Sequence, residues 1–150
     1  MSYQEFVKKG LLRKEKIDFN QIGRVIERAY QNLQSAKILV KKGYEEAGFR
    51  LAYEAMLLAG RALVFSCNLR PRSVGSHKIV VDFTEKILGN KYKVLVRKFD
   101  KMRKKRNYLI YGIGLTISKT EAGKIIGIDV LDHIIITKTK AFSFKQKKLI

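Results

Sequence analysis

The stretch EEAGFRLAYEAMLLAGRALVFS, residues 45–66, decides the fold. Apolar residues fall on every side of a helix drawn through it, and at ~1.5 Å per residue that helix would be about 33 Å long. A helix that is apolar all round must be the most enclosed element of its domain. Its alanines recur at intervals of three and four residues, which permits a close approach by a neighbouring helix: Ala52, Ala55, Ala59 and Ala62. The sequence therefore predicts a central helix with other helices packed around it.

Amphipathic segments lie on both sides of this central one. Residues 19–40 carry apolar side chains at helical spacing. Asp18 or Asn20 can cap the first turn of this helix, and Gly43 can end it in a left-handed conformation. Two further segments show the same spacing, and each is followed by glycine within two residues: 76–88 and 92–111.

The two ends of the chain are less regular. Residues 1–17 predict a short basic helix, and residues 138–150 a basic tail. Ser118 and Glu121 form a capping box ahead of residues 122–136. The isoleucines of that segment permit a strand, but their spacing together with the capping box favours a helix. Because the chain has one proline and lacks the turn-punctuated pattern of β-proteins, we expect one all-α domain over residues 1–150.

Composition points to a polyanionic partner. Of 150 residues, 32 are Lys or Arg and 13 are Asp or Glu, so the formal net charge is +19. Such an excess favours nucleic acid first and an anionic membrane surface second. The one cysteine, Cys67, can form no internal disulfide and is too few for a zinc site. The N-terminus lacks a secretion signal and no run of eighteen apolar residues occurs, so we expect a cytoplasmic protein without membrane spans.

Basic residues are densest between positions 97 and 106. Seven cations lie among these ten residues: Arg97, Lys98, Lys101, Arg103, Lys104, Lys105 and Arg106. Spread over three turns of helix, they cannot all lie on one solvated stripe, so some must line a groove or face another chain. Repulsion between like charges favours phosphate as the ligand, and the predicted role is nucleic-acid binding rather than solubility alone.

Several short strings occur in an order that is typical of one family. They are AYEAMLLAGRAL (52–63), NLRP (68–71), SHK (76–78), RKKRN (103–107) and YG (111–112). With them the chain, from about residue 19 to residue 136, resembles HEPN domains of prokaryotic type. This resemblance implies an up-and-down helical bundle, commonly a homodimer, often encoded beside a minimal nucleotidyltransferase in toxin–antitoxin pairs.

The resemblance also implies a candidate site. Active members of the family are metal-independent endoribonucleases whose motif is an arginine, a polar neighbour and a histidine five positions beyond the arginine. Carried over by position, these are Arg106, Asn107 and Tyr111, so tyrosine stands where the histidine is expected. Histidine titrates near ~6.5 and tyrosine near ~10, so the pKa of Tyr111 would have to fall by about three units for acid–base work. We therefore expect an RNA-binding protein of toxin–antitoxin or defence type, with a degenerate ribonuclease motif.

Two alternatives stay open. The chain could remain an active endoribonuclease that uses Arg106 with an activated Tyr111 or with a substitute such as His77. It could instead be an interaction module that docks a protein partner such as a nucleotidyltransferase.

Other residues could extend the basic surface, namely Arg61, Arg70, Arg72, His77 and Lys78. Arg61 interrupts the most apolar segment, where a buried guanidinium needs a partner such as Glu54 or Glu85. It could otherwise open toward the groove of Arg106, but the pairing is favoured. For His77, a hydrogen-bonded role in the cap region is favoured over catalysis.

Neither histidine has other metal-ligating residues near it in the sequence. We interpret His133 as a core or interface residue. No phosphate-binding loop, dinucleotide fingerprint or nucleophile elbow occurs in the sequence. We expect no cofactor and no metal.

Overall fold

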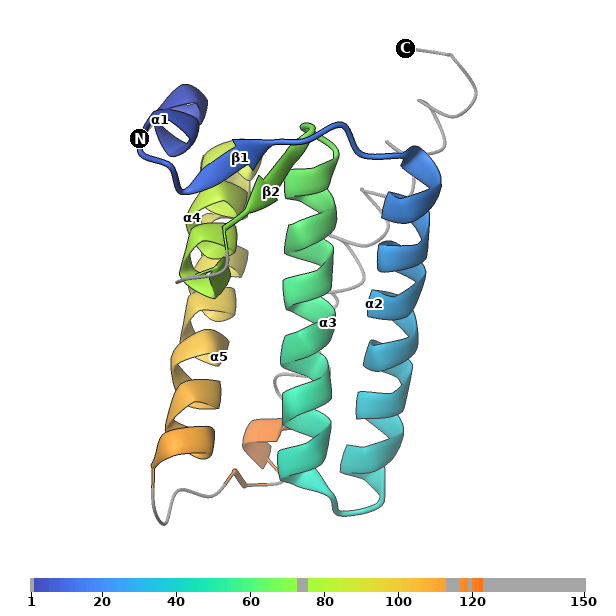
Figure 1. Cartoon of the computed structure of the whole chain (residues 1–150). Coiled ribbons are helices and arrows are strands. Elements are labelled where there is room, and N and C mark those ends of the chain that lie inside the picture. Colours follow the sequence, from blue (N-terminus) through green and yellow to red (C-terminus); the bar gives the residue numbers. More distant parts are fainter. Residues whose placement is uncertain (1, 73–75, 113–116, 119, 123–150) are drawn as a thin grey trace.

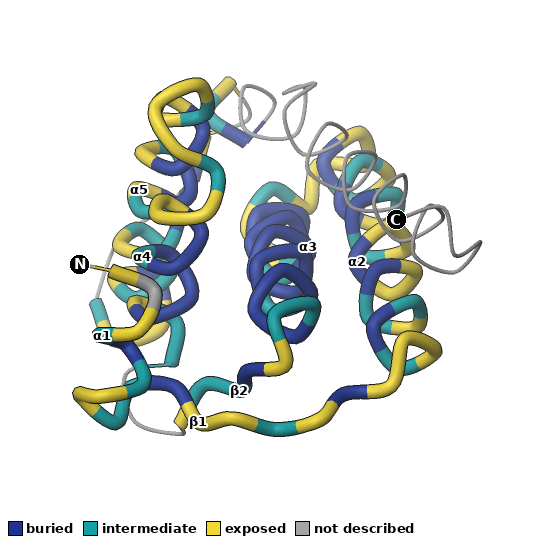
Figure 2. The backbone as a smooth tube through the Cα atoms, turned by 90° about the horizontal axis from the view of Figure 1, so that it is seen from above, coloured by how far each residue is buried: buried dark blue, intermediate teal, exposed yellow. Residues whose placement is uncertain are grey.

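Helix α3 (Glu45–Phe65) forms the centre of the fold, as its sequence predicts. The computed structural model describes residues 2–72, 76–112, 117–118 and 120–122. In it, α3 lies between α2 (Phe19–Lys41) on one side and the pair α4 (Ser76–Leu88) and α5 (Lys93–Tyr111) on the other (Figure 1). Figure 2 shows α3 buried along most of its length, while its neighbours bury only their inward faces. The predicted all-α bundle is confirmed.

Small residues let the neighbouring helices approach α3 closely. The four predicted alanines are at most 1% exposed. Two glycines extend this stripe, a role that the alanine spacing alone did not predict. A Cβ atom on Gly48 would lie 2.5 Å from the Val40 Cγ2 of α2, and one on Gly60 would lie 2.6 Å from the Val80 Cγ1 of α4. The small residues therefore set how near α2 and α4 come to the central helix.

Replacing Gly60 with valine should destabilise the fold by about 1–3 kcal/mol, because the added methyls would displace Val80 and Phe99 in a filled core. Urea unfolding followed by circular dichroism measures the change. The matched control is Ala47→Val on the exposed side of the same helix, where only helix propensity changes, by about 0.6 kcal/mol. Equal losses in the two variants would contradict the close approach at Gly60.

Capping explains where the helices begin and end. Of the two candidate caps of α2, Asp18 is the one used, since its Oδ1 accepts a hydrogen bond from the Asn20 backbone N–H at 3.2 Å. Gly43 ends that helix at φ +84°, in the left-handed region that favours glycine. Ser118 Oγ accepts from the Glu121 backbone N–H at 3.1 Å, so one half of the predicted capping box is present and helix follows at 120–122. The prediction for 123–136 lies outside the described residues, as does the basic tail.

The predicted N-terminal helix over 1–17 is wrong in its second half. Helix α1 (Tyr3–Lys8) ends before Gly10, and strand β1 (Leu12–Lys14) pairs antiparallel with strand β2 (Leu69–Pro71). Pairing buries Leu12 and Leu69 at the end of the bundle, which a solvated helix here could not do. Phe6 then packs edge-on against Phe83 of α4, with ring centroids 5.6 Å apart.

The string NLRP (68–71) contributes to this ribbon. Asn68 adopts φ +55°, and its side-chain Oδ1 accepts a hydrogen bond from the Ile17 backbone N–H at 3.3 Å. A short 3₁₀ helix, η1 (Asn90–Tyr92), joins α4 to α5. Within the described residues, no helix combines the length and the apolar character that crossing a membrane requires.

Candidate nucleic-acid interface

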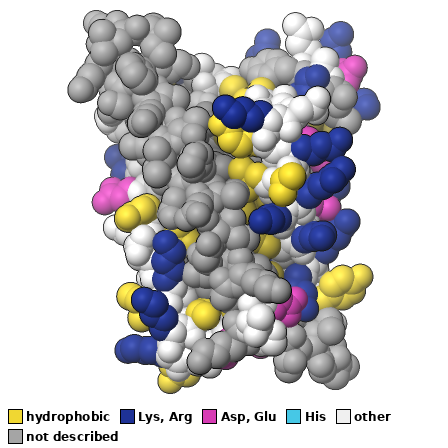
Figure 3. Space-filling model, turned by 180° about the vertical axis from the view of Figure 1, so that it is seen from behind, with side chains coloured by type: hydrophobic (Ala, Val, Ile, Leu, Met, Phe, Trp, Pro, Cys, Tyr) yellow, Lys and Arg dark blue, Asp and Glu magenta, His cyan; other side chains and the backbone are white. Residues whose placement is uncertain are grey.

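The seven clustered cations of α5 point in different directions. Arg97, Lys101 and Lys104 are exposed and line a groove of about 260 Å³ against α4. Figure 3 shows Lys and Arg side chains gathered along the side of the molecule where α4 and α5 lie. The prediction that some of these cations line a groove is confirmed.

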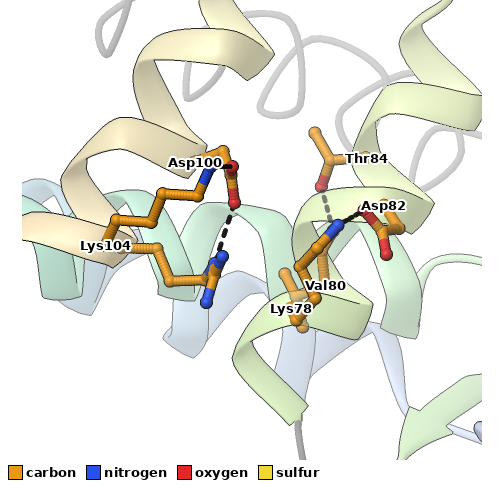
Figure 4. Close-up of polar contacts among 7 residues, drawn as sticks. Lys78, Val80, Asp82, Thr84, Asp100 and Lys104 are labelled. Atoms are coloured by element: carbon orange, nitrogen blue, oxygen red, sulfur yellow. Dashed lines mark hydrogen bonds and ion pairs between the residues drawn. The ribbon is translucent and has the colours of Figure 1, made fainter. Parts of the chain in front are cut away.

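Carboxylates share this α4–α5 groove with the cations. Its charged residues are Lys78, Asp82, Glu85, Arg97, Asp100, Lys101 and Lys104. Lys78 pairs with Asp82, one turn further along α4 (Figure 4). Asp100 accepts from Arg103 Nε at 2.8 Å and pairs with Lys104 Nζ at 3.0 Å. The groove therefore presents mixed charge rather than one continuous cationic strip.

Asp100 holds two of the predicted phosphate-binding residues in place. Partial burial opposes its ionisation, but the hydrogen bonds from Arg103 and Lys104 outweigh this and keep its pKa below the ordinary value. A carboxylate that stays ionised at neutral pH neutralises part of the charge of both partners. Of the cations that line the groove, Arg97 and Lys101 take part in none of the ion pairs that join described residues.

A second set of side chains, which we call the inner cluster, comes from α3, α4 and α5 and is linked by electrostatic effects on Tyr53 and His77. It consists of Tyr53, Arg61, His77, Arg103 and Arg106, with Glu54 nearby. The Tyr53 hydroxyl oxygen lies 3.0 Å from His77 Nδ1, and Tyr53 itself is only 1% exposed. The structure thus brings together two residues from the motif string and two of the secondary candidates.

The electrostatics of the inner cluster favour neutral forms of both Tyr53 and His77. Burial raises the pKa of Tyr53 to about 12, and the positive charges of Arg106 and Arg103 only partly oppose it. Burial lowers the pKa of His77, and the charges of Arg61 and Arg106 lower it further, against the opposing charge of Glu54. His77 is consequently an uncharged imidazole among arginines at pH 7.

We expect His77 to titrate below 6.5 in NMR spectra of the folded protein. In the interval between its lowered pKa and 6.5, the unfolded chain binds more protons than the folded chain, so stability falls as the pH falls. Replacement by glutamine should remove this part of the acid sensitivity, measured by urea unfolding at pH 7.5 and at pH 5.5. A His77 pKa above 6.5 would contradict the surroundings described here.

Tyr111 does not join the inner cluster. Five residues along an α-helix correspond to a rotation of about 140°, so Tyr111 and Arg106 face different directions. Arg106 is half-buried and its guanidinium contacts Asn107 Oδ1 at 3.5 Å, whereas Tyr111 is 81% exposed. Within one chain Arg106 and Asn107 are therefore in contact and Tyr111 is exposed, and a joint site of the three residues stays a prediction.

Arg61 corrects another expectation. It is half-buried rather than enclosed, and among the ion pairs that join described residues none includes it. The favoured pairing with Glu54 or Glu85 is not found there, and the effect of Arg61 on His77 places its charge in the inner cluster.

The remaining candidates lie elsewhere. Arg70 pairs with Glu15 at 2.8 Å and lies over the Phe65 ring, so it holds the β-ribbon rather than extending a basic rim. Lys105 pairs with Glu121 at 3.0 Å. Arg72 is exposed beyond β2, and Lys98 is half-buried on α5.

Sequence reasoning missed Tyr53, the partner that positions His77. The available signal was a phenol in the middle of an apolar helix, because a buried tyrosine hydroxyl normally requires a hydrogen-bond partner. The interpretation of His77 as a hydrogen-bonded residue of the cap region did not name its partner on α3, the Tyr53 hydroxyl. Among the described residues, no group of three or more His, Cys, Asp or Glu side chains is placed to hold a metal ion.

Comparison with known protein families gives a match over the part of the chain that contains these strings. The model of the HEPN domain family matches residues 22–128, most of the chain and all of α3, α4 and α5. The chain belongs to the HEPN domain family. In this HEPN domain the inner cluster contains Arg106, which the sequence had assigned to the motif arginine.

A second likeness covers the end of the chain. The RadC-like JAB domain model matches residues 112–149, a resemblance that the sequence analysis did not predict. The UPF0758 protein CBO3003 of Clostridium botulinum strain Hall is 54% identical over 35 residues, 23% of this chain and 15% of that protein. A UPF0758 protein of Desulforamulus reducens is 63% identical over 38 residues, 25% and 17% of the two chains. The matches to these two relatives each span less than a fifth of the relative's own length.

Proposed function

We propose that this HEPN domain binds RNA through the inner cluster, with Arg97 and Lys101 of the α4–α5 groove as outer contacts. The observation that carries the proposal is that the positive charges of Arg61, Arg106 and Arg103 all act on His77, after burial, to lower its pKa. Arg61 and Arg106 have no carboxylate partner among the ion pairs of the described residues, so their guanidinium groups are available to phosphate.

Membership of the family supports the wider part of the proposal. Two chains would pair and place two copies of Arg106 along one RNA, in a toxin–antitoxin or defence role with a minimal nucleotidyltransferase as partner. The expected stoichiometry is two chains for each bound RNA, measured by light scattering of the complex. One chain for each RNA would contradict the pairing and leave the RNA contacts unaffected.

The salt dependence of binding tests the RNA contacts. Each phosphate neutralised contributes about −0.7 to the slope of log affinity against log salt for single strands. If each of the two paired chains engages Arg61, Arg97, Lys101 and Arg106, the slope should be about −6, measured by fluorescence anisotropy with a labelled single strand. An Arg106→Gln variant loses one contact from each chain and should make the slope shallower by about 1.4. A flat response would contradict RNA binding.

A further inference from the structure

The exposed side of α5 carries aromatic residues in line with cations. Five residues follow one another along it at intervals of four, three, four and three positions: Arg97, Lys101, Lys104, Tyr108 and Tyr111. At ~100° per residue these positions fall within an arc of about 80° around the helix, so they share one face. All five residues are exposed. We call this set the outer stripe.

The outer stripe extends the α4–α5 groove toward the end of α5. Its three cations line that groove, and its two tyrosines follow in the last turn of the helix. In Figure 3, hydrophobic and aromatic surface lies next to the Lys and Arg side chains on the side of the molecule where α5 lies. We propose that the outer stripe binds an unpaired segment of RNA, with Tyr108 and Tyr111 stacked on its bases. The inference rests on the RNA binding proposed above and specifies which form of RNA the site takes.

The two tyrosine rings are open to a ligand. Tyr108 is 61% exposed and Tyr111 is 81% exposed. Neither ring takes part in the aromatic and cation–ring contacts that join described residues. Residues three apart on a helix are neighbours, so the two rings can serve consecutive parts of one strand. Stacking needs bases whose faces are free, which unpaired nucleotides provide and a duplex does not.

The charges of the outer stripe favour RNA over a second copy of the chain. Arg97 and Lys101 belong to none of the ion pairs that join described residues, so both can hold phosphates of the stacked nucleotides. In a two-fold pair that used this face, the stripe would meet itself and its cations would face like charges. A polyanion with exposed bases satisfies both the cations and the rings.

The outer stripe is separate from the inner cluster. Nine residues along α5, from Arg97 to Arg106, correspond to a rotation of about 180°, so the two arginines lie on opposite sides of the helix. Changes to Tyr108 and Tyr111 therefore leave the arginines of the inner cluster in place.

Alanine and phenylalanine variants of the two tyrosines test the stacking. The double variant Tyr108→Ala with Tyr111→Ala should bind a labelled oligouridine at least about 30-fold more weakly than the wild type, because stacking is lost at two positions. Tyr108→Phe with Tyr111→Phe should stay within about threefold of the wild type, since the rings remain. Fluorescence anisotropy at one salt concentration measures both, and thermal unfolding checks each fold.

The matched control removes two exposed tyrosines elsewhere. Tyr30 on α2 is 49% exposed, and Tyr44, ahead of α3, is 61% exposed. Changing both to alanine should alter the affinity for oligouridine by less than about threefold, because neither belongs to the outer stripe. A loss equal to that of the Tyr108 and Tyr111 alanine variant would contradict the assignment.

A matched A–U duplex separates stacking from charge. The Tyr108 and Tyr111 alanine variant should lose less than about threefold in affinity for the duplex, whose base faces are covered. Equal losses for strand and duplex overturn the stacking. Unchanged affinity of this variant for oligouridine overturns the outer stripe as an RNA site and leaves binding at the inner cluster intact. If that variant also separates paired chains in light scattering, the stripe is a contact between copies. Absence of RNA binding by the wild type overturns both proposals.

Discussion

Replacing Tyr53 with alanine is expected to destabilise the fold by about 3–5 kcal/mol, the usual cost of truncating a buried aromatic side chain. Tyr53 is 1% exposed at the middle of α3, and its ring centroid lies 6.2 Å from that of Phe99 on α5. Its loss would open a cavity between the central helix and its neighbours and would leave His77 Nδ1 without its partner. Urea unfolding at pH 7.5, followed by circular dichroism, measures the loss.

Tyr53→Phe is the matched control for this variant. It keeps the ring and removes only the hydroxyl, so we expect it to lose about 1 kcal/mol, the net value of one hydrogen bond. The difference between the two variants isolates the contribution of the buried ring. A loss below about 1 kcal/mol for the alanine variant would contradict the enclosed position of Tyr53, because the cavity left by a buried aromatic ring lowers the free energy of unfolding by more than that.

Local patterns predicted most of the fold. The limits of α4, residues 76–88, and the start of α3 at Glu45 agree with the sequence interpretation, because apolar spacing acts within a few residues. The sequence did not predict the β-ribbon, because the pairing of its strands is not local. Its strands have three residues each and pair across more than fifty residues of sequence, so neither contains a usable alternation of its own.

The candidate site was predicted in part. The motif string names Arg106 and Asn107 together, and the Arg106 guanidinium lies 3.5 Å from Asn107 Oδ1. The contact between His77 and Tyr53 depends on how α4 packs against α3, which no spacing within either helix determines. Arg61 was interpreted as a buried partner of an acid because its segment is apolar, yet its position on α3 leaves it half-exposed.

The second large effect concerns RNA affinity. A double variant, Arg61→Gln with Arg106→Gln, should bind single-stranded RNA at least 100-fold more weakly than the wild type. A charge-assisted hydrogen bond contributes about 1.5–3 kcal/mol, so two lost phosphate contacts amount to about 3–6 kcal/mol, or a factor of at least ~10². Fluorescence anisotropy at one fixed salt concentration measures the change, since affinities at different ionic strengths are not comparable.

The control must remove the same charge elsewhere. Lys8 and Lys9 are exposed at the end of α1, which packs near Phe83 of α4 and away from the inner cluster. Changing both to glutamine lowers the net charge by the same two units, yet should weaken binding less than about threefold, because charges beyond a Debye length of ~8 Å are largely screened at physiological salt. Equal weakening in the two double variants would mean that RNA responds to total charge alone. Thermal unfolding of each variant checks that its fold is intact. Weaker binding of the Arg61 and Arg106 double variant alone would then locate the phosphate contacts at the inner cluster.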